Sequence, residues 1–222
     1  MRNLLFASAM IIAALAGPPC VQASDLSSAP VVDWKGFYIG AQGGWTSANV
    51  TDTYDLVTPF NFSANGLQGG PVAGYNYQSG NMVLGLEGDV SFGSVSATAL
   101  CNGASVPVCA GSGTNPTFNL RTTGTVRGRI GYAVDQVMFY GTGGVGIADV
   151  SVSDPLQAGT DDKTHVGFVA GAGAEWMITQ STSLRLEYLY SRYPTINYAL
   201  VSTPDSIGFD SHSVRAALNF HF

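Results

Sequence analysis

The chain is poor in charged residues, which make up 11% of its 222 positions, and its only lysines are Lys35 and Lys163. The formal net charge of -6 argues against nucleic-acid binding, because that function needs a basic face. Beyond the N-terminus, no apolar run approaches the roughly 20 residues of a transmembrane helix. Helix-favouring charged residues are scarce, whereas glycine and aromatic residues are frequent. This balance suits strands joined by tight turns.

The N-terminus has the features of a secretory signal peptide over residues 1–23. Arg2 supplies positive charge, an apolar run follows, and small side chains precede a cleavage site near Ser24. The run is too short to span a membrane as a helix. We therefore expect an exported protein with a periplasmic N-terminal segment over residues 24–33 and a single barrel domain over residues 34–222.

Two cysteines, Cys101 and Cys109, remain after removal of the predicted signal peptide. They lie close enough in sequence to form one disulfide in an oxidising compartment. The segment around them is rich in small residues, and a disulfide would restrict it.

The rest of the chain contains eight segments in which apolar and polar side chains alternate. In the last segment, Val214, Leu218 and Phe220 share one face, while Arg215 and Asn219 share the other. Alternate side chains of a strand point to opposite faces, so this pattern predicts half-buried strands. The eight segments are residues 37–45, 67–77, 82–92, 120–132, 137–147, 165–176, 183–190 and 213–222.

The connections between these segments alternate between long and short. The long ones are predicted over residues 46–66, 93–119, 148–164 and 191–212, and the short ones over residues 78–81, 133–136 and 177–182. An even number of strands with such asymmetric ends predicts an all-β fold, an eight-stranded antiparallel up-and-down transmembrane β-barrel. A soluble lipocalin-like barrel has the same number of strands, so the facing of the side chains must distinguish the two.

The less apolar face carries most of the arginines and a nearly matching number of acids. A water-facing exterior would more often use lysine. The interior of an eight-stranded barrel is just wide enough to be filled by side chains, and arginine can bind carboxylates bidentately there. We therefore predict an apolar face in lipid and a charge network in the lumen, made of Glu87, Asp89, Arg121, Arg127, Arg129, Glu175, Arg185, Glu187 and Arg215.

Aromatic residues gather at both ends of the predicted strands. Such positions are typical of the two aromatic girdles of an outer-membrane barrel, at the level of the lipid headgroups. Those beside the short turns or the C-terminus are Tyr75, Tyr77, Tyr132, Trp176, Phe220 and Phe222, and those beside the long connections are Trp45, Phe92, Tyr188 and Tyr190.

Several motifs resemble those of the OmpA-like small outer-membrane barrels of alphaproteobacteria, often labelled porin-family surface antigens. They are WKGFYIG (34–40), AGYNY (73–77), LGLEGD (84–89), RGRIGY (127–132), LEYLY (186–190) and NFHF (219–222). The resemblance implies a place in the bacterial outer membrane and insertion by the barrel assembly machinery, which reads a final aromatic strand, here with Phe220 and Phe222. It also implies structural or surface-antigen roles, sometimes with haem binding or modest pore activity, and usually no catalysis.

Other motifs in the sequence give weaker indications of function. Gly141, Gly143 and Gly146 match a dinucleotide fingerprint, but a strand-like segment follows where that motif needs a helix. Among His165, His212 and His221, His212 has Ser211 and Ser213 beside it, but neighbours in a strand point to opposite faces and no acid lies at the right spacing. We therefore predict no catalytic residue, metal site or cofactor. The acidic predicted loops could hold divalent cations with lipopolysaccharide, although a solvated loop surface is favoured.

The sequence thus predicts an outer-membrane barrel with a filled lumen that serves envelope structure and surface interaction, in contact with outer-membrane lipid and lipopolysaccharide. Eight strands leave little water-filled space, which favours a filled lumen over a pore. A narrow channel or a receptor for a small ligand such as haem is the alternative within the same fold, and a soluble lipocalin-like carrier is the third. Any extracellular ligand stays unidentified at this stage.

Overall fold

The computed structural model describes residues 32–54, 58–98, 117–154, 159–198 and 205–222. The predicted signal peptide and the predicted disulfide between Cys101 and Cys109 lie outside the described residues. Among the described residues, no helix has the length and apolar character needed to cross a membrane.

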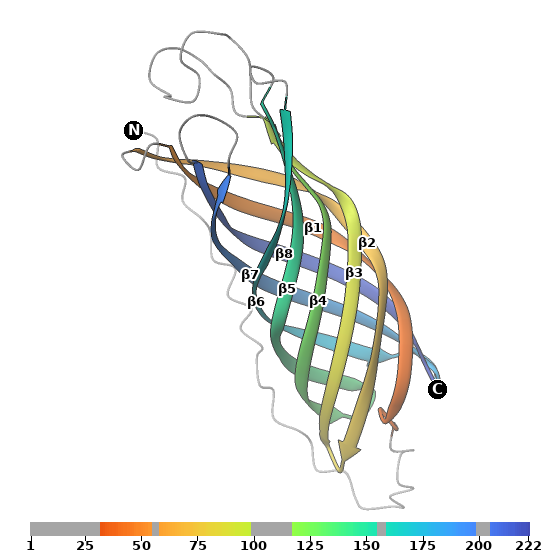
Figure 1. Cartoon of the computed structure of the whole chain (residues 1–222). Helices are drawn as coiled ribbons and strands as arrows, with labels where there is room; N and C mark the ends of the chain where they lie inside the picture. Colours follow the sequence, from red (N-terminus) through yellow and green to blue (C-terminus); the bar gives the residue numbers. More distant parts are fainter. Residues whose placement is uncertain (1–31, 55–57, 99–116, 155–158, 199–204) are drawn as a thin grey trace, which may run out of the picture. The chain divides into compact units, whose positions relative to one another are not determined.

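Eight antiparallel strands close into a barrel in which each strand pairs with its neighbours in sequence and β1 pairs with β8 (Figure 1). The predicted fold class is confirmed. The strands are β1 (Gly36–Tyr54), β2 (Thr58–Ser79), β3 (Met82–Thr98), β4 (Thr117–Val134), β5 (Val137–Asp154), β6 (Gly159–Met177), β7 (Thr182–Tyr198) and β8 (Asp205–His221).

One end of the barrel, here called the turn end, carries three short turns and the end of β8. The turns fall between β2 and β3, between β4 and β5, and between β6 and β7, where short connections are predicted. Gly80 and Asp135 have φ values of 59° and 53°, in the left-handed region that tight hairpin turns require. The opposite end is called the loop end.

The strands run much further toward the loop end than the sequence pattern predicts. Residues 46–66 are predicted as a long connection, yet most of them belong to β1 and β2, which pair from Thr46 and Gly66 up to Tyr54 and Thr58. The predicted connections over 148–164 and 191–212 are likewise mostly strand. These predictions are wrong because the outward residues of the strands at the loop end are polar, and segments rich in polar residues were predicted as loops.

The reason for this polarity is that apolar and polar residues exchange faces along the barrel. Toward the turn end, apolar residues such as Phe37 and Leu86 point outward and are 67% and 69% exposed. We call this outward surface the apolar belt; it includes Phe37, Ile39, Leu67, Leu84, Leu86, Val126, Ile130, Val145, Leu186, Val214 and Leu218. Toward the loop end, Asn49 and Asn65 are exposed instead, while Val50 and Ala64 are buried.

Register shifts occur close to the level of this inversion on three strands. They lie between Phe92 and Val95 on β3, between Leu120 and Thr122 on β4, and between Tyr193 and Ile196 on β7. On β4 the extra residue exchanges inward and outward positions beyond it. On β1 the period is unbroken, since Tyr38 and Val50 are both buried, so there the polarity of the sequence changes while the facing stays the same. The barrel therefore joins a lipid-facing section to a section with a water-facing wall and an apolar interior.

Candidate functional site

The lumen holds a network of arginines and carboxylates at the level of the apolar belt. On β3 and β4, Glu87 lies directly opposite Arg127, and on β6 and β7, Glu175 lies opposite Arg185. All four side chains face inward and are at most 4% exposed. Opposite residues of an antiparallel pair have neighbouring Cβ atoms. Strand pairing therefore sets cation beside anion along the inner wall.

Several ion pairs cross the lumen. Arg185 on β7 donates from Nη1 to Oε2 of Glu87 on β3, although these strands are not neighbours in the barrel. Arg215 on β8 binds Asp89 on β3, with 3.2 Å between Nη1 and Oδ2. These contacts fill the centre of the lumen with side chains.

Arg127 is the centre of the network. Its Nη2 atom lies 2.5 Å from Oε1 of Glu87 and 3.0 Å from Oδ1 of Asp89. Its Nη1 atom lies 3.0 Å from Oε2 of Glu187 on β7. The Nε group donates to the hydroxyl of Thr125 at 2.9 Å. One guanidinium thus contacts three buried carboxylates, and Arg185 and Arg215 supply further positive charge to Glu87 and Asp89. Such carboxylates would be costly to bury without cations.

Arg129 lies between two tyrosine rings. The guanidinium carbon is 4.7 Å from the centroid of Tyr38 and 5.4 Å from that of Tyr140, which is cation–π geometry. Nη1 pairs with Oε2 of Glu175 at 3.0 Å, and Nε donates to Oδ1 of Asn76 at 2.9 Å. The rings therefore pack the space around the charges rather than leaving it to solvent.

An apolar cluster closes the lumen at the turn end. Trp34, which precedes β1, is completely buried and packs with Met138 and Met177. Its backbone N–H donates to Oε1 of Gln78 at 2.7 Å, and its ring meets the edge of the His221 ring at a centroid distance of 5.9 Å. The segment before β1 thus covers the charged layer from this side.

A second apolar cluster fills the loop end. Its buried members are Ala48, Val50, Ala64, Val95, Phe118, Leu120, Ala148, Val150, Tyr193, Ile207 and Phe209. The Phe209 ring stacks on Tyr193 at 4.5 Å and meets Phe118 and His165 edge-on at 5.9 and 5.3 Å. Within the described part of the chain, the charged layer therefore lies between two apolar layers. The sequence pattern missed both.

The structure brings eight of the nine predicted network residues together, but Arg121 is not among them. Arg121 is exposed on the outer wall, whereas its neighbour Leu120 is buried. Counting by twos from Arg127 places Arg121 inside. The register shift between Leu120 and Thr122 reverses this order, so the assignment of Arg121 to the lumen is wrong.

The remaining predicted residues lie as follows. Phe220 and Phe222 point outward and are 52% and 74% exposed. Among the described residues, no group of three or more histidine, cysteine, aspartate or glutamate side chains is arranged to hold a metal ion.

Several residues of the lumen network were not among those predicted to form it, although Asn219 lies on the same predicted face as Arg215. Tyr38 and Tyr140 donate from their hydroxyls to Glu87 and Glu187 at 2.5 and 2.9 Å. Glu175 is likewise surrounded by three side chains. Ser183 and Asn219 donate to it at 2.5 and 2.7 Å, and Nε2 of His221 lies 3.5 Å from one of its oxygens.

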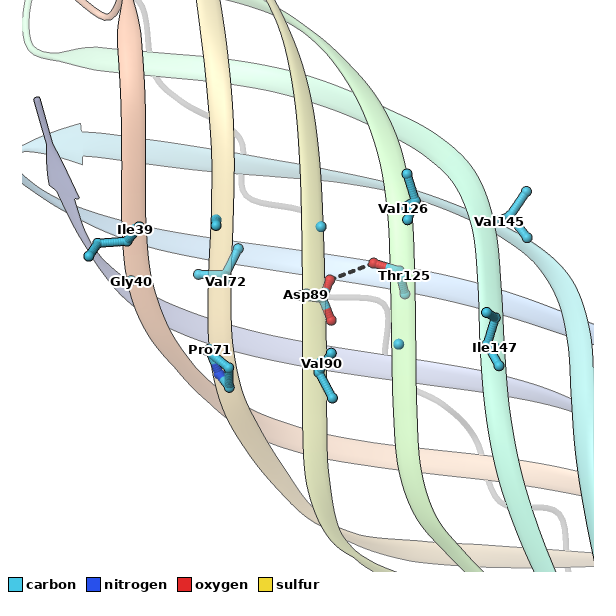
Figure 2. A pocket seen from close by; sticks show the side chains of 13 residues that line it. Ile39, Gly40, Pro71, Val72, Asp89, Val90, Thr125, Val126, Val145 and Ile147 are labelled. Carbon is cyan, nitrogen blue, oxygen red and sulfur yellow. Dashed lines mark hydrogen bonds between the residues drawn. The ribbon is translucent and has the colours of Figure 1, made fainter.

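The outer wall carries a shallow hollow of about 800 Å³ over β1 to β5 (Figure 2). Apolar side chains of the belt line it, among them Ile39, Val90, Val126 and Ile147. The hydrogen bond from Thr125 to Asp89 lies in the same region of the wall, with both side chains buried. The hollow faces lipid, so it is a feature of the membrane surface of the barrel.

Comparisons with known proteins agree with this architecture. Residues 4–222 match the family described as "Outer membrane protein beta-barrel domain". The chain is 32% identical over 194 residues to a 22 kDa outer membrane protein of Rhizobium leguminosarum bv. viciae, which covers 87% of this chain and 80% of that protein. It is also 32% identical over 250 residues to the 31 kDa outer-membrane immunogenic protein of Brucella melitensis biotype 1, with full coverage of both.

Among solved structures, the outer membrane protease OmpT from Escherichia coli covers 84% of this chain and 97% of its own, with a TM-score of 0.50 and 10% identity. This likeness shows the fold alone. The two relatives bear out the resemblance to small alphaproteobacterial outer-membrane proteins. With its barrel closed, its apolar belt outward and its family matched over nearly the whole length, this chain belongs to the outer membrane protein beta-barrel domain family and lies in the bacterial outer membrane.

Proposed function

We propose that this protein is a closed, non-conducting barrel that contributes to envelope structure and presents its loop end for interactions at the cell surface, without catalysis. In outer-membrane barrels the short turns face the periplasm and the longer loops face outward. The surroundings proposed for it are outer-membrane lipid and lipopolysaccharide. The barrel assembly machinery is its proposed partner during insertion, with Phe220 and Phe222 in the recognised strand.

The observation that carries this proposal is the filling of the lumen at three successive levels. Trp34 covers the turn end, ion pairs centred on Arg127 cross the middle, and the cluster around Phe209 fills the loop end. An ion on its way through would have to displace an apolar cluster, the charge network and a second apolar cluster. This weighs against the narrow-channel alternative.

A surface role draws support from the relatives. The Brucella melitensis relative is named an outer-membrane immunogenic protein. The water-facing wall at the loop end, with exposed residues such as Asn49 and Asn65, would raise the loops above the lipid surface. We extend the surface-antigen role to this chain on those grounds.

The contacts of the buried serine and histidine favour a structural role over hydrolysis. The Ser183 hydroxyl donates to Glu175 at 2.5 Å and lies 2.9 Å from Nε2 of His221. In a hydrolytic triad the acid orients the opposite ring nitrogen of the histidine and leaves the serine free to attack. Ser183 is fully buried in the lumen, where no substrate would reach its hydroxyl.

The test is conductance of the folded mature protein in planar lipid bilayers, with a large water-filled porin as the positive control. We expect no stable single-channel current. Reproducible current steps from correctly folded protein would contradict the proposal and favour the channel alternative. Titration with haem, followed by absorbance, tests the receptor alternative separately. Saturable one-to-one binding would replace the structural role with a receptor role.

A further inference from the structure

A polar and aromatic cluster lies on the outer wall of β7 and β8, at the loop-end margin of the apolar belt. Its members are Tyr188, Tyr190 and Arg192 on β7 and Asp210 and His212 on β8. Tyr190 lies opposite His212, and Arg192 lies opposite Asp210. We call these five residues the β7–β8 cluster.

Direct contacts hold the cluster together. The Tyr188 hydroxyl lies 2.7 Å from Nδ1 of His212, and the Tyr190 ring packs on the same imidazole at 5.3 Å between centroids. The Tyr190 hydroxyl donates to Oδ1 of Asp210 at 3.1 Å, and Nε of Arg192 lies 3.7 Å from the same oxygen. Asp210 therefore accepts a hydrogen bond from the tyrosine and lies beside the guanidinium.

The cluster is placed at the level of lipid headgroups. Along β8, the outward residues run from Phe220 through Leu218 and Val214 to His212, so the wall is apolar directly below the cluster. A tilted transmembrane strand needs about 9–11 residues, which brings His212 to the far interface when Phe220 lies at the near one. Trp45, opposite Val214 on β1, marks the same aromatic girdle.

The cluster presents donors that suit an anion. The Tyr188 hydroxyl engages Nδ1 of His212, which leaves Nε2 as the ring nitrogen that can donate to a ligand when it carries a hydrogen. The Arg192 side chain is 64% exposed and pairs with Asp210 through Nε. A guanidinium in this position can bind a phosphate with strong, charge-assisted hydrogen bonds.

We propose that the β7–β8 cluster binds the phosphate of a phosphorylated lipid headgroup in the outer leaflet. Arg192 and His212 contact the phosphate, Asp210 positions Arg192, and the acyl chains lie on the apolar wall at Val214. The continuity of the cluster with the apolar belt identifies the occupant as a lipid rather than a free phosphate. This inference rests on the proposed envelope function, for which it supplies a specific contact with lipopolysaccharide.

The test compares binding of bisphosphorylated lipid A by the folded protein in nanodiscs and by two variants, followed by native mass spectrometry. The first variant combines Arg192→Gln with His212→Gln. The matched control is Arg121→Gln, because Arg121 is also an exposed arginine on the outer wall but lies on β4. We expect affinity to fall about tenfold or more in the double variant, since it loses charge-assisted hydrogen bonds, and to stay unchanged in the control.

Two further probes identify the recognised group. Dephosphorylated lipid A should bind as weakly to the wild type as lipid A binds to the double variant, and inorganic phosphate should not compete. Equal binding of dephosphorylated lipid A would overturn the inference in favour of sugar recognition. Competition by phosphate would show a free-anion site, and an equal loss in the Arg121→Gln control would show unspecific charge attraction. Bilayer conductance does not depend on this site, so the closed-barrel proposal is tested independently.

Discussion

Replacing Arg127 by methionine should destabilise the barrel more than any change at an exposed arginine. Arg127 is 1% exposed and lies within 3.0 Å of oxygens from Glu87, Asp89 and Glu187. Removing one partner of a single buried pair costs about 3–5 kcal/mol, because the remaining charge stays buried without compensation. Three carboxylates lose a partner here, so we expect a loss of at least about 3–5 kcal/mol.

The assay is urea unfolding in lipid vesicles, followed by tryptophan fluorescence and by the heat-modifiable shift in gel mobility. Arg121→Met serves as the control, because Arg121 is exposed on the outer wall, and surface substitutions usually change stability by about 0.5 kcal/mol or less. An unfolding midpoint in Arg127→Met that equals the wild-type value would refute the reasoning that the lumen charges support one another.

A double variant tests the cause of the loss. Within the described part of the chain, the ion pair of Glu187 is the one with Arg127. Adding Glu187→Gln to Arg127→Met removes one uncompensated charge, so it should recover part of the lost stability. The loss of stability caused by Glu187→Gln is also measured in the wild-type background. If the same loss is found when Glu187→Gln is added to Arg127→Met, the two residues act independently, and their ion pair does not explain the lost stability.

Three further changes test the closure of the barrel, its facing and its turn end. Gly44→Ala places a Cβ 2.1 Å from the carbonyl oxygen of Val214, so it should block the pairing of β1 with β8. The control is Gly43→Ala, which should be tolerated because the nearest atom to its Cβ lies 3.9 Å away. Equal refolding yields of the two variants would contradict this expectation. Val126 is 68% exposed on the apolar belt, so Val126→Arg should cost about 2–4 kcal/mol near the bilayer midplane, measured by unfolding from vesicles; an unchanged midpoint would argue that this face does not touch lipid. Trp34→Ala should cost about 3–5 kcal/mol through the cavity that it leaves; a wild-type unfolding curve would mean that Trp34 does not seal the turn end.

The sequence pattern located the charge network well where the two-residue period is unbroken. Glu87 and Arg127 fall on inward positions of strands with regular register, and both were predicted inside. The same counting failed for Arg121, because one extra residue in β4 reverses inward and outward positions. A register shift leaves no distinct mark in a chain rich in glycine and threonine, so the failure is local and has a physical cause.

The partners within the lumen could not be predicted from the sequence. Arg185 and Glu87 are 98 residues apart and meet across the barrel, which depends on the tilt and stagger of all the strands between them. The loop-end cluster was missed for a different reason. Its strands carry polar residues such as Asn49 and Asn65 on the outside, and the prediction took an apolar outer face as the mark of a strand.

The change from an apolar to a polar outer wall also fixes how deep the barrel sits in the bilayer. If the cylinder sank toward the periplasm, Asn49 and Asn65 would enter hydrocarbon, and if it rose, Phe37 and Leu86 would meet water. Both displacements are unfavourable, so the wall has a single resting height. Membranes thinner or thicker than this span would have to deform around the protein, at a cost of fractions of a kcal/mol per Å. The molecule is therefore matched to one bilayer thickness.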